Sequence, residues 1–287
     1  MHDKMALQTN LNVPPYHDDY NEVDNYYQYL FKPGFPIQAR ELTGMQSMIQ
    51  NQISTLAERF MKDGDNVVPG EFGLSSPVSY VRVSSITQGA TPAEFIGYTF
   101  TGVTSGVQAE CIFAVAETEA DDITFYVQYT NSGNDSNLGN FIEGETLTTN
   151  TPNFYTASVG LTGVSKPITS PPTGAGSLFD CREGYFYIDG YMVRSTRQTI
   201  VIGKYTTKES AIIGFRVDED IVNSTEDTSL LDNATGYSNF AAPGADRMKI
   251  SLVLTSIPLN STLPNFIKLC TVVSGNVQGT PGDTVKW

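Results

Sequence analysis

The stretch that decides the fold is residues 31–64, FKPGFPIQARELTGMQSMIQNQISTLAERFMKDG. Pro33 and Gly34 oppose a helix before residue 36, whereas Pro36 suits a first helical turn, because its missing N–H has no partner to lose there. Apolar side chains then recur at steps of three and four residues, the spacing of one stripe along an α-helix. This apolar stripe consists of Leu42, Met45, Ile49, Ile53, Leu56 and Phe60.

The helical segment is predicted to span residues 36–64. Arg59 and Lys62 would stand in its last turn, where cations suit the negative end of the helix dipole, and Gly64 is a left-handed stop. The helix proper, residues 36–62, would be about 40 Å long at about 1.5 Å per residue. Gly44 inside it costs about 1 kcal/mol relative to Ala, which indicates the close approach of another backbone.

The two faces of this helix leave two interpretations open. The stripe either packs on the chain's own β-structure or pairs with helices of other subunits. Pairing is possible because Leu42, Ile49 and Leu56 share one heptad position, with Met45 and Gln52 at the other. A partner can cover the opposite, uncharged face with a smaller desolvation penalty than charges would impose. That face carries Gln38, Gln46, Ser47, Gln50, Asn51, Gln52, Ser54 and Thr55.

Residues 1–35 are predicted to form an extended N-terminal arm. Pro14 and Pro15 disfavour helix, and the tyrosines that follow offer large contact area with a polar tip. The arm either reaches a neighbouring subunit or wraps its own domain. As a hypothesis, arm and helix share one assembly surface, whose residues are Tyr26, Tyr27, Tyr29, Phe31, Phe35, Gln38, Leu42, Met45, Ile49, Gln52 and Leu56.

From residue 65 the pattern changes to the alternation typical of β-strands. A first β-domain, residues 65–165, is predicted to be a small barrel or sandwich. Its expected strands are 79–86, 94–101, 106–116, 123–129 and 143–149. Residues 162–177 are rich in Pro and Gly and are interpreted as a connector.

A second β-domain is predicted at residues 166–287. It contains a hairpin over 184–194 that turns at Asp189-Gly190, and a long loop at 225–246 of the kind that is usually functional. Its further strands are expected at 198–202, 210–217, 248–255 and 265–273. The predicted fold class is therefore mainly β with one long N-terminal α-helix, and two β-barrel or sandwich-like regions after an extended arm.

Composition disfavours several classes of function. The net charge is −14, which argues against nucleic acid as a partner, because phosphates need local positive charge. No apolar run approaches the length of a membrane span, so we expect no membrane insertion, and the first residues lack the apolar core of a secretion signal. Cys111, Cys181 and Cys270 are far apart and are expected to be free, buried thiols.

Motifs that would specify an enzyme are absent from the sequence. Both histidines, His2 and His17, lie in the arm, where no scaffold presents them for nucleophilic catalysis or zinc binding. Asp121-Asp122 and the acids at 218–220 have the residue types of a glycosidase, but acids this common more often form a solvated surface. We therefore expect no catalytic activity, no cofactor and no metal.

Several segments resemble one family. YHDDY at 16–20 and YLFKPGFPIQARELT at 29–43 resemble the N-terminal region of virion structural proteins from T4-like tailed phages, especially those infecting cyanobacteria. GYFYIDG at 184–190, SLLDNATG at 229–236 and NFAAPGADR at 239–247 are similar to the same family. The resemblance implies a tail, baseplate or tail-fibre attachment component that assembles with itself, as a dimer or trimer, and with other tail or baseplate proteins.

The resemblance also implies a location in the virion after synthesis in the host cytoplasm. In such proteins this region often precedes fibre-like extensions, and the sequence ends at Trp287 without one, which favours an adaptor or scaffold. The alternative is a receptor- or carbohydrate-binding β-module of a tail fibre. Aromatic side chains would then stack on sugars, although alternation predicts that half of them face the core. These are Tyr185, Phe186, Tyr187 and Tyr191.

Overall fold

The computed structural model describes residues 9–68, 70–119, 121–134, 139–150, 155–160 and 171–278. Within them the protein is mainly β, with one α-helix, α1 (Ala39–Ala57), near the N-terminus. Single 3-10 turns lie at Glu22–Asp24, Pro92–Phe95 and Thr228–Leu230. The strands are β1 Asn66–Val68, β2 Phe72–Ile86, β3 Thr99–Gly102, β4 Gln108–Val115, β5 Ile123–Asn131, β6 Thr146–Thr149, β7 Thr156–Val159, β8 Thr173–Cys181, β9 Gly184–Ile188, β10 Tyr191–Ser195, β11 Gln198–Gly203, β12 Ala211–Val222, β13 Arg247–Ile257, β14 Phe266–Val273 and β15 Asn276–Gln278.

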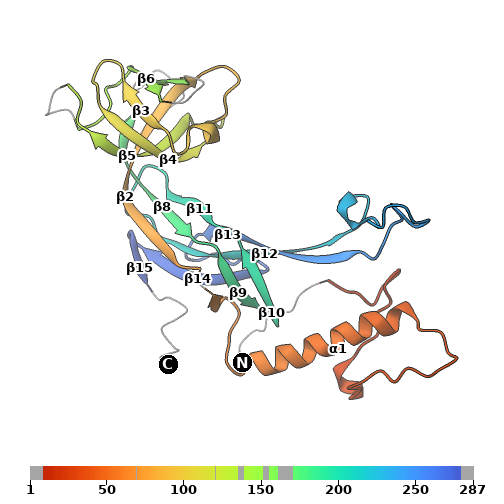
Figure 1. The fold of residues 1–287 in the computed structure, drawn as a ribbon. Helices are drawn as coiled ribbons and strands as arrows, with labels where there is room; N and C mark the ends of the chain where they lie inside the picture. Colours follow the sequence, from red (N-terminus) through yellow and green to blue (C-terminus); the bar gives the residue numbers. More distant parts are fainter. Residues whose placement is uncertain are drawn as a thin grey trace.

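Six strands close into a barrel at one end of the molecule (Figure 1). Their order is β2-β5-β4-β3-β6-β7, and β7 returns to pair with β2. The rings of Phe95 and Phe100 each lie 5.1 Å from that of Phe125 in the barrel core. The predicted barrel-or-sandwich region is thus a barrel, and its strand β7 was not predicted from the sequence.

Strand β2 belongs to three ladders. Ser79, Tyr80 and Val81 pair with β5 on one side and with β8 on the other, while the end of the strand pairs with β7. The β8 ladder shifts register between Ser75 and Val78. Pro77 lies in that irregularity, where a residue without an N–H donor is tolerated. The two predicted β-regions therefore share a continuous backbone ladder.

The predicted connector at 162–177 is wrong in its last part, because residues 173–177 begin strand β8. Residues 161–170 lie outside the described residues. The glycines of β8 serve close packing instead of turns. A Cβ on Gly174 would lie 2.7 Å from the Tyr80 hydroxyl, and one on Gly176 would lie 2.7 Å from the carbonyl oxygen of Gly203.

The second β-region surrounds its own core. Sheet β1-β9-β10 and sheet β13-β12-β14-β15 pack with β8 and β11, and the rings of Phe186 and Phe215 meet edge to face at 4.7 Å. The hairpin predicted at 184–194 is confirmed as β9 and β10. Asp189 and Gly190 have φ of 41° and 88°, as a two-residue hairpin turn requires.

Strands β12 and β13 form a long hairpin that extends from this region on the same side as α1 (Figure 1). Its tip carries residues 223–246, which include the segment expected as a long loop. The tip is held by an isolated bridge between Leu231 and Pro243. The arm contacts the same hairpin, because the Tyr16 hydroxyl donates to Asp246 Oδ2 at 2.6 Å.

Helix α1 is shorter than the predicted 36–62. Pro36 precedes it, and the helix is capped at Gln38, whose N–H donates to Glu41 Oε2 at 2.9 Å. Its 19 residues make it about 28 Å long instead of about 40 Å. Arg59 and Lys62 lie beyond its last turn. Gly64 has φ of 92° as expected, but its N–H donates to the Tyr187 carbonyl, which directs the chain into β1.

Candidate functional site

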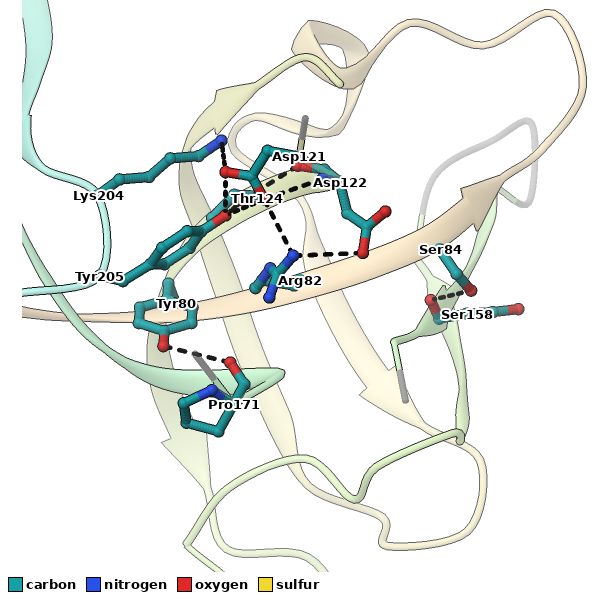
Figure 2. A network of polar contacts seen from close by, with 10 residues as sticks. All are labelled: Tyr80, Arg82, Ser84, Asp121, Asp122, Thr124, Ser158, Pro171, Lys204 and Tyr205. Atoms are coloured by element: carbon teal, nitrogen blue, oxygen red, sulfur yellow. Dashed lines mark hydrogen bonds and ion pairs between the residues drawn. The ribbon is translucent and has the colours of Figure 1, made fainter. Parts of the chain in front are cut away.

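A buried group of charges lies where the barrel meets the second β-region (Figure 2). Arg82 of β2, whose side chain is 2% exposed, approaches Asp121 Oδ1 at 2.9 Å and Asp122 Oδ2 at 3.4 Å. Lys204, from the segment after β11, approaches Asp121 Oδ2 at 2.6 Å. We call these residues together with Tyr205 the polar cluster.

Tyr205 completes the polar cluster. Its hydroxyl donates to Asp121 at 2.7 Å, and its ring centroid lies 5.0 Å from the Arg82 guanidinium carbon. Burial raises the pKa of Tyr205, and the hydrogen bond to Asp121 adds to that rise. The phenol therefore stays protonated, and it shares a hydrogen bond with Thr124 of β5 at 2.9 Å.

The polar cluster joins the barrel to the second β-region through ion pairs and hydrogen bonds. Burial opposes ionisation of Asp121, but hydrogen bonds from Lys204 and Tyr205 outweigh it and lower the pKa of this carboxyl. A glycosidase general acid needs the reverse, a raised pKa. The interpretation of Asp121 and Asp122 as solvated surface is also wrong, since Asp122 is 4% exposed. Asp121 and Asp122 lie 39 and 40 residues from Arg82 in the sequence, so no local pattern indicated that they would pair with it.

The three cysteines are free and buried, as expected. Burial raises the pKa of Cys111 and Cys181 to about 12 and that of Cys270 to about 11. Because the thiolate is the reactive form, these thiols are unreactive at neutral pH.

The side of α1 that packs on the chain itself carries polar residues together with Met48, which is 4% exposed. Gln50 Nε2 donates to the Gly190 carbonyl at 2.7 Å, and Asn51 Nδ2 donates to the Tyr20 hydroxyl at 3.0 Å. Ser47 donates to Asp18. Part of the uncharged face thus meets the arm and the β9–β10 turn, whereas Gln38, Gln46, Gln52 and Thr55 remain exposed.

Gly44 lies on this packed face. A Cβ there would collide with the Tyr29 hydroxyl and lie 3.1 Å from its ring carbon Cζ. The expected close approach of a backbone is therefore wrong, because a side chain of the arm fills the space. Burial, followed by the charges of Asp19 and Asp18, raises the pKa of Tyr29.

The apolar stripe faces solvent. Ile49 is 54% exposed, Leu56 66% and Phe60 69%, and Leu42 and Ile53 are also exposed. The interpretation that the stripe packs on the chain's own β-structure is therefore wrong. Sequence periodicity identified the apolar stripe, but the residues of α1 that the chain buries are Gly44, Met48 and Ser54 on the opposite side.

The arm wraps its own helix in part and leaves large side chains in solvent. Asp19 pairs with Arg40 at 2.8 Å, whereas Tyr26, at 69%, and Phe35, at 72%, are exposed. Of the eleven residues predicted to form the assembly surface, Tyr29 and Met45 are half-buried. The other nine are exposed: Tyr26, Tyr27, Phe31, Phe35, Gln38, Leu42, Ile49, Gln52 and Leu56.

Further exposed apolar residues extend this surface beyond the predicted set. Ile53 and Phe60 belong to the apolar stripe and were visible in its spacing, whereas Leu30 of the arm and Ile37, just before α1, gave no periodic signal. The hairpin tip exposes Tyr237 and Phe240 as well.

The four aromatics proposed to stack on sugars do not form one platform. Phe186 and Tyr187 are buried, Tyr191 is half-buried, and Tyr185 is exposed. The expectation that about half of them face the core therefore agrees with the structure.

Within the described residues, two further observations concern other functions. No group of three or more His, Cys, Asp or Glu side chains is placed to hold a metal ion. No helix combines the length and hydrophobicity that crossing a bilayer requires.

Comparison with known proteins gives one similarity. Residues 175–283 match the model of a family described as a domain of unknown function, DUF4815. The matched range starts within β8 and includes the β12–β13 hairpin, but excludes α1 and the barrel. No curated protein and no solved structure matches the chain.

Replacing Arg82 tests the joint. Arg82→Met removes the buried cation beside Asp121 and Asp122, although Asp121 keeps its contact with Lys204. We therefore expect a loss of about 3 kcal/mol in the free energy of unfolding, measured by urea denaturation. The control is Arg182→Met, because the Arg182–Glu71 pair is about 70% exposed and such pairs contribute at most about 1 kcal/mol. Equal losses in both variants would contradict a structural role for the cluster.

The lowered pKa of Asp121 predicts a pH dependence. Its contribution to stability is present above its unfolded pKa of about 3.9 and is lost as pH falls through the lower, folded pKa. The melting-temperature difference between wild type and Asp121→Asn should be large at pH 7 and shrink below about pH 4. A difference that stays constant down to pH 3 would show that the Asp121 charge contributes nothing.

Gly44→Ala tests how the arm is held. The new methyl displaces Tyr29, while the helix gains up to about 1 kcal/mol of intrinsic propensity. We therefore expect faster amide exchange in residues 19–38 without a lower melting temperature. Gly73→Ala is the control, because a Cβ there meets nothing within 4 Å. Unchanged exchange in the arm of Gly44→Ala would disprove the anchoring contact.

Proposed function

We propose that this chain is a structural subunit of a phage tail, baseplate or tail-fibre attachment, which acts by protein–protein assembly and not by catalysis. The observation that carries the proposal is the apolar stripe, turned away from the chain that bears it. The resemblance of residues 16–20 and 29–43 to virion structural proteins of T4-like phages supports the tail assignment. Its place would be the virion, after synthesis in the host cytoplasm.

Exposed apolar area supplies the driving force. Complete burial of a Leu, Ile or Phe side chain contributes about 1.5–3 kcal/mol. Leu42, Ile49, Ile53 and Leu56 are each about half exposed, so covering them would contribute about 1 kcal/mol apiece. Contiguous apolar patches of this kind are typical of protein–protein contact sites.

The arm adds the residue types that dominate binding energy. Tyr26, Tyr27, Phe31 and Phe35 are exposed next to the start of α1, and aromatic anchors are enriched among interface hot spots. The helix is already held by hydrogen bonds to its own chain, so a partner would not have to order it. The barrel lies at the far end of the molecule (Figure 1) and would remain free to contact other tail proteins.

The test uses particles of the phage that encodes the chain. Gold-labelled antibody against the purified protein should mark the tail or baseplate. The double variant Tyr26→Ala, Tyr27→Ala should be incorporated into particles much less well, since truncating an aromatic hot spot weakens binding by about 30-fold or more.

The control for this variant is Tyr98→Ala, which removes an exposed tyrosine of the barrel region and should leave incorporation unchanged. Absence of the chain from purified particles would refute the proposed function. Normal incorporation of the double variant would remove the arm from the assembly surface.

A further inference from the structure

The apolar stripe is opposite the face that α1 packs on its own chain. At about 100° per residue, the stripe residues from Leu42 to Leu56 lie within about 80° of the helix circumference. Gly44, Ser47 and Ser54, which face the arm and the β9–β10 turn, lie on the other side. The apolar stripe is therefore preformed on a helix that hydrogen bonds already anchor to its own chain, and the described residues leave the stripe uncovered.

The face is also uncharged. Residues 42–57 contain no Asp, Glu, Lys or Arg, although the chain as a whole carries a net charge of −14. Two copies of so acidic a protein repel each other, and charges buried at a contact carry a large desolvation penalty. The uncharged face is thus the place where two copies can meet at least electrostatic cost.

The order of side chains along the apolar stripe favours contacts between identical residues of two copies. Leu42, Ile49 and Leu56 occupy one heptad position, and Met45 and Gln52 occupy the other. When two such helices lie parallel and in register, each layer contains one residue type. Gln52 then meets Gln52, and an amide can both donate and accept, so the pair satisfies itself.

The antiparallel arrangement is less favourable. Centred on Ile49, it would place Gln52 against Met45 of the other helix, which leaves the amide without a strong partner in an apolar contact. A single polar residue of this kind is known to specify the register of paired helices.

We infer that α1 pairs, parallel and in register, with the α1 of a second or third copy of this chain. The inference rests on the proposed function and names the first partner of that assembly surface. The arm's aromatics would then flank the helix pair and remain available to other proteins. An apolar helix of a different tail protein is the competing occupant, which the experiment below separates.

The size of the full-length protein tests the inference. Wild type should sediment as a dimer or trimer, and Ile49→Asp should weaken self-association by more than about tenfold, because it buries a carboxylate at the centre of the contact. Val103→Asp is the matched control, since Val103, at 62% exposed, is comparable to Ile49 but follows barrel strand β3, and it should associate as wild type does. Circular dichroism shows whether each variant is folded.

Disulfide trapping tests the orientation of the paired helices. It also tests whether the helices pair at all, should Ile49→Asp fail to fold. Leu42→Cys should link to itself between copies under mild oxidation. A mixture of Leu42→Cys and Leu56→Cys should give few mixed links, which an antiparallel pair would favour. The native thiols are buried and will not compete.

The outcomes separate this inference from the proposed function. A wild type that remains monomeric well above micromolar concentration, or an oligomer unaffected by Ile49→Asp, overturns self-pairing, as does predominant linkage of residue 42 to residue 56. If the wild type is a monomer that still enters the phage tail, and Ile49→Asp prevents this incorporation, then the apolar stripe binds a different protein and the proposed function stands. An oligomer that pairs through α1 but is absent from particles leaves the inference intact and refutes the tail assignment.

Discussion

One strand carries the geometry of the whole molecule. Ser79, Tyr80 and Val81 of β2 pair with β5 on one edge and with β8 on the other, so the barrel cannot swing against the second β-region without breaking backbone hydrogen bonds. Each such bond contributes about 1 kcal/mol, and the polar cluster around Arg82 reinforces the same place. This continuity fixes the barrel at one end and α1 at the other (Figure 1).

Helix α1 depends on this frame because it is docked by its polar side. Hydrogen bonds from Gln50 to the β9–β10 turn and from Asn51 to the arm satisfy groups that would otherwise face water. The apolar side is left outward, the reverse of an ordinary surface helix. Specific polar partners and the burial of Met48 hold the helix in this orientation, which leaves hydrophobic area for contact with other polypeptides.

Sequence reading recovered the elements whose signal is local. Alternation located most strands, and Asp189-Gly190 predicted the β9–β10 turn. It failed where structure depends on distant residues. The glycines of β8 look like turn signals, but Gly174 makes room for Tyr80. Periodicity predicted the apolar stripe and most of the candidate surface, but it carries no information on which face the chain covers. The pairing of Arg82 with Asp121 was equally invisible.

The distance between the barrel and α1 affects where the barrels would lie in an assembly of several copies. Were copies gathered about a common axis along α1, each barrel would stand away from that axis, because β2 pairs with strands of both the barrel and the second β-region. A small hub made of helices would then set the radius at which the barrels stand. Because β2 lies in the barrel and not in α1, the reach of the barrels and the contact between helices would depend on different parts of the chain.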